Sequence, residues 1–521
     1  MGGGDHRCEW RDRAEALEGD LARAKEELST LRNTLEKTTT ELIENRSELA
    51  DQGEKLSAVV ATLEKLQRQV FGKRSEKIPR IDDELRASAA ADPAIALERR
   101  RENAEERKRV VVPRQIEHKI PDDRKTCPRC GGHDFSDLGP GKVTEIYELL
   151  PPLIERQIHI QEKLRCKCGE GILTADPPPR VYDKARFGPN LIASVVVAKC
   201  ADAIPLHRQA KAFQRAGIPM SDSTLGDVFH RAAEITEPLS KRLLDLVASS
   251  EIVLADETTV RVQAKGKTRT AWLWDFIARD EQGRDLIAYV YSRSRSGETP
   301  ERVLAGTEGK LLVDGYTGYN KVTLPGGRER AGCLAHLRRK FFEASAAAPD
   351  LARKAMDLIL DVYRVERMAM DDGVYGTPEH LKRRKAHAEP SMIELKLLLD
   401  QEKDKHPPKG PMGEAIRYAL GQWNALNLFL TDARLPVDNN LSERALRAAA
   451  LGRKNYLFVG HDVAGENLAG LYALVATCAA NGVNPTAYLA DVLLRVQTHP
   501  ASRIDEILPH NWKPPATQPP A

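Results

Sequence analysis

The sequence has no apolar stretch long enough to cross a lipid bilayer. Its most apolar run, Leu191–Ala198, is only eight residues long, whereas a transmembrane helix needs about 20. The opening residues MGGGDHRCEW lack the apolar segment of a secretory signal, and His6 stands where a myristoylation signal has Ser or Thr. We therefore expect a cytoplasmic protein with no membrane partner, associated with the nucleoid when it is bound to DNA.

Cysteine and net charge are also scarce. The chain of 521 residues has eight cysteines, which in the cytoplasm are expected as thiols or metal ligands rather than disulfides. The net charge is only +3, so any surface for nucleic acid must be local. The length suits roughly three or four domains, and the pattern below predicts a multidomain α+β fold.

Residues 10–78 show a heptad repeat. Leucine recurs every seven residues. The positions three residues after each leucine include Asn45 and Gln52, which would lower the stability of a coiled coil but could fix the register of its helices. The pattern predicts a coiled coil between chains, giving a homo-oligomer, expected to be a dimer; a helix packed on its own chain is the alternative. The heptad leucines are Leu21, Leu28, Leu35, Leu42, Leu49, Leu56 and Leu63.

Two close cysteine pairs follow a charged, alanine-rich linker at 79–120. Each pair is trailed by glycine, and four thiolates in a tetrahedron suit structural Zn²⁺, so residues 121–180 are expected to form a small zinc-knuckle-like module. The second pair has the unusual spacing C-x-C, so His133 could replace a cysteine, and four reduced structural thiols remain the alternative. The four cysteines are Cys127, Cys130, Cys166 and Cys168.

Residues 181–249 have a helical pattern. A helix, a turn at Gly217 and a Ser/Asp cap before a second helix resemble a helix-turn-helix. Many helical hairpins have this pattern without binding DNA, so both interpretations stay open.

The sequence pattern changes from helical to strand-like at Glu251. Three apolar segments, EIVLAD, TAWLWDFIAR and DLIAYVYSRSR, precede a short helix in GETPERVLAG and further strands in GKLLVDGYTGYN and RERAGCLAH. Three strands, a helix and a strand open an RNase H-like fold. We expect this α/β catalytic domain at 250–460, with an all-helical insertion at about 341–431 and a C-terminal helical segment and tail at 461–521.

Two acids follow apolar strands, and a third stands in a later helix. Asp256 and Asp314 at the ends of neighbouring strands would lie side by side, and like charges that close require a cation. Mg²⁺ takes carboxylate oxygens, and Glu443 is the best third ligand. Glu257 and Asp438 are rivals for a ligand role. Any one of these acids alone could be a capping or solvated residue.

Basic residues surround the third acid and a second motif. CLAH, at Cys333–His336, has C-x-x-H spacing without a second pair, so a buried cysteine is expected there rather than zinc. The residues expected to contact DNA phosphates are His336, Arg338, Arg339, Lys340, Arg444, Arg447, Arg453 and Lys454.

Several motifs together cover almost the whole chain: FGKRSEK, CPRCGG, ADETTV, LLVDGYTGY, CLAHLRRKFFE, VDNNLSERALR, LGRKNYLF and NGVNPTAYLADVLLRV. In combination they resemble the insertion-sequence-66 family of bacterial DDE transposases. The resemblance implies catalytic carboxylates in the segments matching Asp256, Asp314 and Glu443, and small accessory proteins encoded by the same element. The C-x-C pair departs from the family, whose members commonly space it more widely.

The resemblance implies an enzyme that binds the ends of an insertion sequence, cleaves DNA and transfers the 3′-OH ends to target DNA. The reaction would be two-metal phosphoryl transfer with Mg²⁺, for which Mn²⁺ could substitute. Two alternatives remain: a metal-dependent nuclease or resolvase on the same fold, and a DNA-binding regulator with an inactive core.

Overall fold

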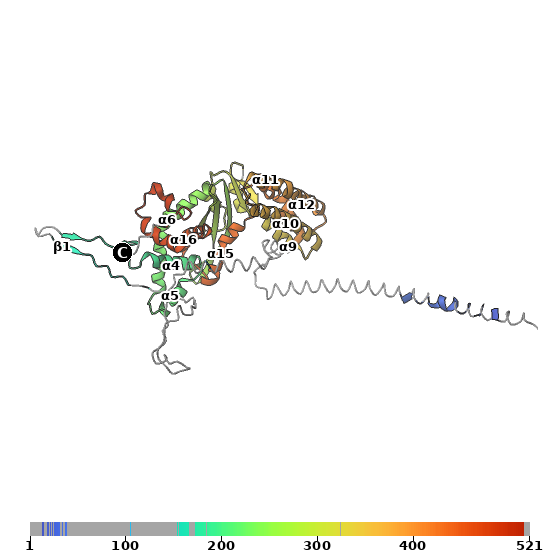
Figure 1. Ribbon diagram of the computed structural model, residues 1–521, viewed down its shortest axis with the longest axis horizontal. Helices are drawn as coiled ribbons and strands as arrows, with labels where there is room; N and C mark the ends of the chain where they lie inside the picture. Colours follow the sequence, from blue (N-terminus) through green and yellow to red (C-terminus); the bar gives the residue numbers. More distant parts are fainter. Residues whose placement is uncertain are drawn as a thin grey trace, which may run out of the picture. The chain divides into compact units, whose positions relative to one another are not determined.

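The computed structural model describes residues 154, 156–165, 172–183, 185–323 and 325–514, with Glu105 and, near the N-terminus, 13–14, 18–19, 21, 23, 25–31, 34 and 37–38. The chain divides into two compact units, Met1–Arg80 and Ile81–Ala521. The helices and strands labelled in Figure 1 belong to the second unit.

The described residues of the first unit are all helical. Leu21 and Leu28 of the heptad series are 55% and 66% exposed, and Leu31 of the partner series is 67% exposed. The later heptad leucines lie outside the described residues. An exposed seam on a single chain suits a coiled coil without its partner, and the coiled coil remains a prediction.

The second unit is mixed α/β, built on a five-stranded sheet in the order β5-β4-β3-β6-β7. Its strands are β3 (Ile252–Ala264), β4 (Lys267–Arg279), β5 (Asp285–Ser292), β6 (Lys310–Val313) and β7 (Glu329–Gly332). The β3–β4 and β4–β5 pairs are antiparallel, whereas β3–β6 and β6–β7 are parallel. The five segments expected to form strands all do so. A separate short hairpin joins β1 (Lys163–Arg165) to β2 (Ile172–Thr174).

Strand β3 is longer than expected. The sequence predicted a strand that ends at Asp256, but β3 continues to Ala264 and turns into β4 through Lys265 and Gly266. Gly266 has φ +70°, a conformation that favours glycine in a two-residue hairpin loop. The β-branched residues Thr258, Thr259, Val260 and Val262 after Asp256 suit an antiparallel edge, and they extend the strand beyond its pairing with β6.

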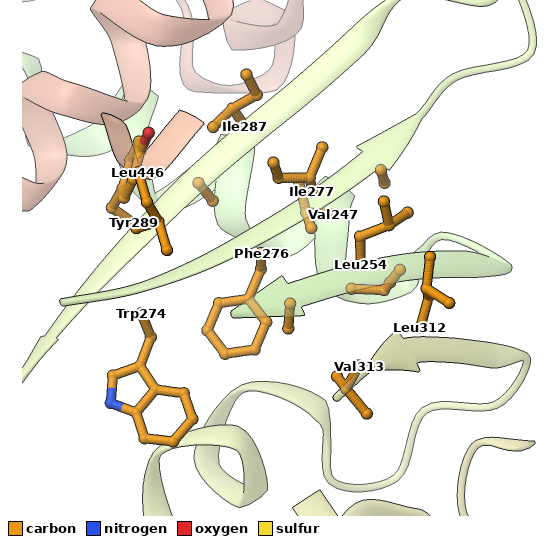
Figure 2. Packing of buried hydrophobic residues seen from close by; sticks show 14 of the residues in the cluster. Val247, Leu254, Trp274, Phe276, Ile277, Ile287, Tyr289, Leu312, Val313 and Leu446 are labelled. Atoms are coloured by element: carbon orange, nitrogen blue, oxygen red, sulfur yellow. The ribbon is translucent and has the colours of Figure 1, made fainter. Parts of the chain in front are cut away.

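One face of the sheet is covered by three long helices, α6 (Asp222–Ser249), α15 (Asn440–Tyr456) and α16 (Asp462–Ala480). In Figure 2, Ile277 and Ile287 lie on this face near Val247 of α6, and Tyr289 lies beside Leu446 of α15. Trp274 and Phe276 point to the other face, where Trp274 packs edge-on to Tyr319. The strand alternation therefore builds two separate apolar layers.

Helix α16 is the one helix among the described residues that is long and apolar enough to cross a membrane, with 61% of its most apolar window buried in the fold. Leu191–Ala198, the run singled out in the sequence, belongs to the shorter helix α4 (Pro189–Cys200). Thr477 of α16 bonds both the N–H and the C=O of Ile287 in β5, which fixes the helix to the sheet. Its apolar composition is explained by this packing.

The region before the sheet is helical, as expected. Helix α5 (Leu206–Arg215), a turn at Gly217 and α6 follow α4, and Ser221 caps α6 by accepting from the N–H of Thr224 at 3.1 Å. Because α6 packs on β4 and β5, it is a core helix over much of its length. DNA contact by this hairpin remains a prediction.

A helical segment separates β7 from α15, and one buried ion network holds it. Arg384 and Glu366 form a two-point ion pair at 2.6 and 2.7 Å, and Arg384 also donates to the C=O of Phe429 at 2.8 Å. The helices of the segment are α9 (Leu334–Ala344), α10 (Pro349–Asp371), α11 (Pro378–Arg383), a π-turn (Arg384–Ala388), α12 (Glu389–Glu402), α13 (Pro411–Gly421) and α14 (Trp423–Asn427).

The remaining described elements are short. They are α7 (Glu298–Leu304), α8 (Asn320–Thr323), α17 (Pro485–Arg495) and the 3₁₀ turns Thr317–Tyr319, Leu428–Leu430 and Ala501–Ile507.

The exposed heptad positions generate a prediction. Changing Leu21, Leu28 and Leu31 to Glu should lower the oligomeric mass of the chain, because each leucine buried between chains stabilises by roughly 1.5–3 kcal/mol. Light scattering measures the mass. A matched triple variant, Ser29, Thr30 and Thr34 to Glu, adds the same three negative charges at positions outside the seam and should leave the mass unchanged. Equal masses for both variants would mean that any oligomer forms elsewhere.

Candidate active site

The parallel pairing of β3 with β6 brings Asp256 and Asp314 together. Leu254 is paired with Leu312, and the two aspartates stand two residues further along their chains. Asp256 Oδ1 accepts the backbone N–H of Glu257 at 2.8 Å. Asp314 Oδ1 accepts the backbone N–H of Tyr316 at 2.8 Å. The expectation that these acids are neighbours is met through the register, although Asp256 lies within its strand.

Glu443 stands in the first turn of α15, which packs across β3 and β4. Two neighbours fasten this turn to the sheet. Asn439 donates from Nδ2 to the C=O of Ala255 at 2.9 Å, and the Ser442 hydroxyl lies 2.6 Å from both oxygens of Asp275. Since Ala255 precedes Asp256, the third acid is held beside the first.

Asp275 was missed by the sequence reasoning. It lies opposite Asp256 on β4, is fully buried, and accepts the N–H of Asp256 at 2.9 Å. It therefore connects β3 with Ser442 of α15. The signal was present as a single acid inside the apolar run WLWDFIA, because an acid there must find donors or remain protonated. Burial, and then the charge of Asp256, raises the pKa of Asp275 well above its usual range.

The acids that converge here repel one another. Burial raises the pKa of Asp256 to about 7, and the charges of Glu257, Asp314 and Glu443 act in the same direction, against the hydrogen bond from the N–H of Glu257. A buried carboxyl group among other acids binds a proton or a cation near neutral pH.

Glu257, a rival ligand, points to the opposite face of the sheet from Asp256. Its side chain is 2% exposed, its Oε1 lies 2.6 Å from Arg295, and its Oε2 accepts the Tyr319 hydroxyl at 2.8 Å. Both oxygens are thus occupied. Glu257 neutralises a cation on the second face and is poorly placed to share one with Asp256.

Asp438, the second rival, fastens the start of α15. Its Oδ2 accepts the Tyr363 hydroxyl at 2.8 Å and the Asn440 side chain at 2.6 Å, and its Oδ1 accepts the N–H of Asn440 at 3.0 Å. These contacts match the alternative from the sequence that Asp438 is a capping residue.

Helix α9 brings cations toward the acids. Arg339 lies 3.5 Å from Glu443, and His336 is half-buried near Asp314 and Glu443. Burial lowers the pKa of His336 below its usual range, although the two acids oppose this. Arg338 is 6% exposed and faces the interior, whereas Lys340 is exposed.

The basic residues of α15 divide into two groups. Arg444, Arg447 and Lys454 are exposed. Arg453 instead turns to β3, where it donates to the C=O of Thr259 at 3.0 Å. Its guanidinium fastens the helix to the sheet.

Within the ranges that the structure describes, no three His, Cys, Asp or Glu side chains lie close enough to hold a metal ion. The donor chemistry still fits Mg²⁺, which prefers carboxylate oxygens. Asn439 Oδ1 and His336 Nδ1 are buried near these acids and have no hydrogen-bond partner among the described residues. The set of donors is suitable, but it is not assembled as a closed site in this structure.

The expected zinc ligands Cys127, Cys130, Cys166 and Cys168, and the alternative ligand His133, lie outside the described residues. Three described cysteines, Cys200, Cys333 and Cys478, are buried free thiols. Cys333 accepts the N–H of Asn439 at 3.3 Å, so CLAH supplies a buried cysteine beside the site, as expected.

Comparison with known families defines the class of this protein as a transposase. A family model described as "Transposase IS66 family" matches residues 184–467, and one described as "IS66 C-terminal element" matches 473–510. The chain belongs to the IS66 transposase family, which confirms the resemblance stated from the motifs.

Three relatives come from Sinorhizobium fredii (strain NBRC 101917 / NGR234). "Uncharacterized protein y4hP" is 30% identical over 479 residues, covering 85% of this chain and 86% of the relative. "Uncharacterized protein y4jD" is 32% identical over 413 residues, covering 76% and 79%. "Uncharacterized protein y4qI" is 32% identical over 456 residues, covering 84% and 82%.

The contacts of Asp275 predict a positioning role for its partner. Ser442→Ala should reduce the free energy of unfolding by about 1–3 kcal/mol, because a buried carboxyl oxygen loses its donor. It should also raise the MgCl₂ concentration needed for half of the thermal shift that MgCl₂ produces, because Glu443 is held less well. Ser249→Ala, at an exposed serine of α6, is the control. Lost stability with an unchanged Mg²⁺ requirement would mean that Ser442 is only structural.

The raised pKa of Asp256 predicts pH-dependent stability. The folded carboxyl keeps its proton up to about pH 7, and the unfolded one up to about 4, so stability declines as pH rises through this window. A bound divalent cation favours the ionised form, and the thermal shift produced by MgCl₂ should grow from acidic to mildly alkaline pH. Thermal unfolding measures it. In Asp256→Asn the Mg²⁺ shift should be small and independent of pH; a wild-type shift that is equally flat would contradict the argument.

Proposed function

We propose that this chain is a DDE transposase that binds the ends of an insertion sequence, cleaves DNA there and transfers the 3′-OH ends to target DNA. The observation that supports this most is the position of Asp256 and Asp314 on paired strands beside the first turn of α15, where the charges of Asp314 and Glu443 both act on Asp256. Family membership supports the transposase class.

The proposed catalytic domain is RNase H-like. In support, three antiparallel strands are followed by a helix and two parallel strands, in the order β5-β4-β3-β6-β7. The helical segment α9–α14 is then an insertion between the second and third acids.

The carboxylates of Asp256, Asp314 and Glu443 would hold Mg²⁺, with Mn²⁺ as a substitute. When bound, the metal ions would activate water or a 3′-OH and stabilise the leaving oxygen in phosphoryl transfer. The chain itself orients the donors: Asp275 and Asn439 fix Asp256 and Glu443 in relation to each other. Arg339 neutralises Glu443, and a DNA phosphate would offer this arginine another anionic partner.

The proposed DNA surface combines the exposed cations of α15 and α9. Arg444, Arg447 and Lys454 suit phosphate contacts, as does Lys340. His336 and Arg339 lie closest to the acids and suit the scissile phosphate. Arg338 and Arg453, also expected to bind DNA, are turned inward, so we assign them to positioning these helices.

Three parts of the proposal concern the rest of the chain. The heptad region pairs two chains, which would hold two element ends together. Cys127, Cys130, Cys166 and Cys168 hold a structural zinc, and elemental analysis should find about one zinc per purified chain. The protein acts in the cytoplasm on nucleoid DNA, with small accessory proteins encoded by the same element.

A nuclease or resolvase would use the same carboxylates. Pre-cut element ends separate the two activities, because a transposase joins them to target DNA whereas a nuclease does not. An inactive regulator would bind DNA without metal-dependent nicking.

Replacement of each proposed metal ligand should abolish both cleavage and joining. Asp256→Asn, Asp314→Asn and Glu443→Gln should each reduce both rates by roughly 1,000-fold, which corresponds to several kcal/mol of lost charge stabilisation. DNA affinity should be retained. Gel assays with element-end duplexes measure the rates, and mobility shifts measure affinity.

Glu466→Gln, at an exposed acid of α16, is the matched control and should keep wild-type rates. Near-normal activity of Glu443→Gln together with an inactive, folded Asp438→Asn would transfer the third ligand role to Asp438.

A further inference from the structure

The exposed side of α15 forms a continuous stripe. Positions 444, 447, 451 and 454 are exposed, and their spacing of three and four residues places them on one side of the helix. Three of the four are cations, and the fourth, Leu451, is 49% exposed. The stripe begins next to Glu443 and runs to the C-terminal end of the helix.

The helix ends in a strained turn that exposes two apolar side chains. Leu457 has φ +58° and ψ −45°, and it is one of two described non-glycine residues with positive φ. This conformation costs about 1–3 kcal/mol for a residue with a side chain. Leu457 is 67% exposed and Phe458 is 42% exposed, so their own burial does not offset the strain.

Contacts on both sides hold the turn. Asn455 donates to the C=O of Ala203 at 2.9 Å, and the Tyr456 hydroxyl lies 2.8 Å from that of Tyr472. After the turn, Val459 bonds β3 in both directions, at 2.7 and 2.8 Å. The apolar tip is therefore fixed in place and projects from a rigid base.

The surroundings of the tip suit a polyanion. The exposed Lys454 precedes it by one helical turn. Asp462, just after the turn, is paired with Arg269 and Arg293. The neighbouring acid is thus neutralised, while cations continue along the helix.

We propose that Leu457 and Phe458 form a wedge that enters the base stack of DNA bound along the exposed side of α15. This rests on the proposed function. Apolar side chains inserted at a base step unstack it, and phosphate contacts along the stripe would offset the free energy lost in unstacking. From residue 443 to residue 457 the helical rise is ~21 Å, so the unstacked step would lie roughly six base pairs from the reacting phosphate.

The test uses the full chain and duplexes of the element's terminal sequence, each with 2-aminopurine at a different position. Binding should increase 2-aminopurine fluorescence at one or two adjacent positions only. Phe458→Ala should remove this increase and weaken binding roughly tenfold, within the range that stacking of a base on an aromatic ring supplies. Fluorescence anisotropy of an end-labelled duplex measures the affinity.

A second variant separates the wedge from folding. Leu457→Gly should raise the thermal midpoint, because glycine accepts the positive φ, and should still reduce the fluorescence increase. Ile393→Ala removes an apolar side chain of α12 that is 56% exposed, and should change neither signal. A tip that serves a protein partner instead would leave both DNA signals unchanged in Phe458→Ala, which would overturn the wedge.

The outcomes also distinguish the wedge from the proposed function. Tight binding of terminal duplexes with no fluorescence increase at any position would overturn the wedge alone. An increase seen equally on duplexes of unrelated sequence would support the wedge and count against specific recognition of element ends. Wild-type protein that binds no duplex would overturn both.

Discussion

The crowding of carboxyl groups in the centre of the sheet is the constraint on which the site depends. Asp256, Glu257, Asp275, Asp314 and Glu443 influence one another through a largely buried space, where like charges are costly. These carboxyl groups have different hydrogen-bond and ion-pair partners. Arg295 and Tyr319 compensate Glu257, a backbone N–H and a hydroxyl bond Asp275, and Arg339 pairs with Glu443. Asp256 is influenced by three acids without a compensating cation among these contacts, so a divalent cation would be most stabilising beside it.

Strand alternation explains how adjacent acids acquire different roles. Successive residues of β3 point to opposite faces, so Asp256 meets α15 while Glu257 meets the layer of Tyr319. A shift of one residue in the register would exchange them. The long pairing of β3 with β4 opposes such a shift. The buried hydrogen bond from the Asp256 N–H to Asp275 Oδ1 opposes it further, because only one alignment of the two strands allows this bond.

The sequence predicted the strands, the helical segment that follows them and the neighbouring strands of Asp256 and Asp314, because apolar runs and chain order carry that information. It misplaced Asp256 at a strand end, since the Thr and Val residues that follow could belong to a loop or to a continued antiparallel edge. It expected Arg338 and Arg453 to face DNA. A basic residue on a helix is expected to be exposed unless the packing face of the helix is known. In the structure Arg338 is buried and Arg453 bonds to strand β3. Asp275 escaped notice because its importance comes from a partner 167 residues away.

Helix α15 couples these features because it is one rigid element with opposed faces. Its inner side holds Ser442 against Asp275 and Arg453 against β3, near its two ends, so the helix cannot tilt without breaking buried polar contacts. Its outer side carries the cations. A duplex seated on that side is therefore aligned by the contacts that set the position of Glu443. The turn after the helix is fixed as well, because hydrogen bonds of Asn455 and Val459 hold it on both sides of Leu457. In the proposed complex, substrate alignment and acid placement would thus arise from the same hydrogen bonds between α15 and the sheet.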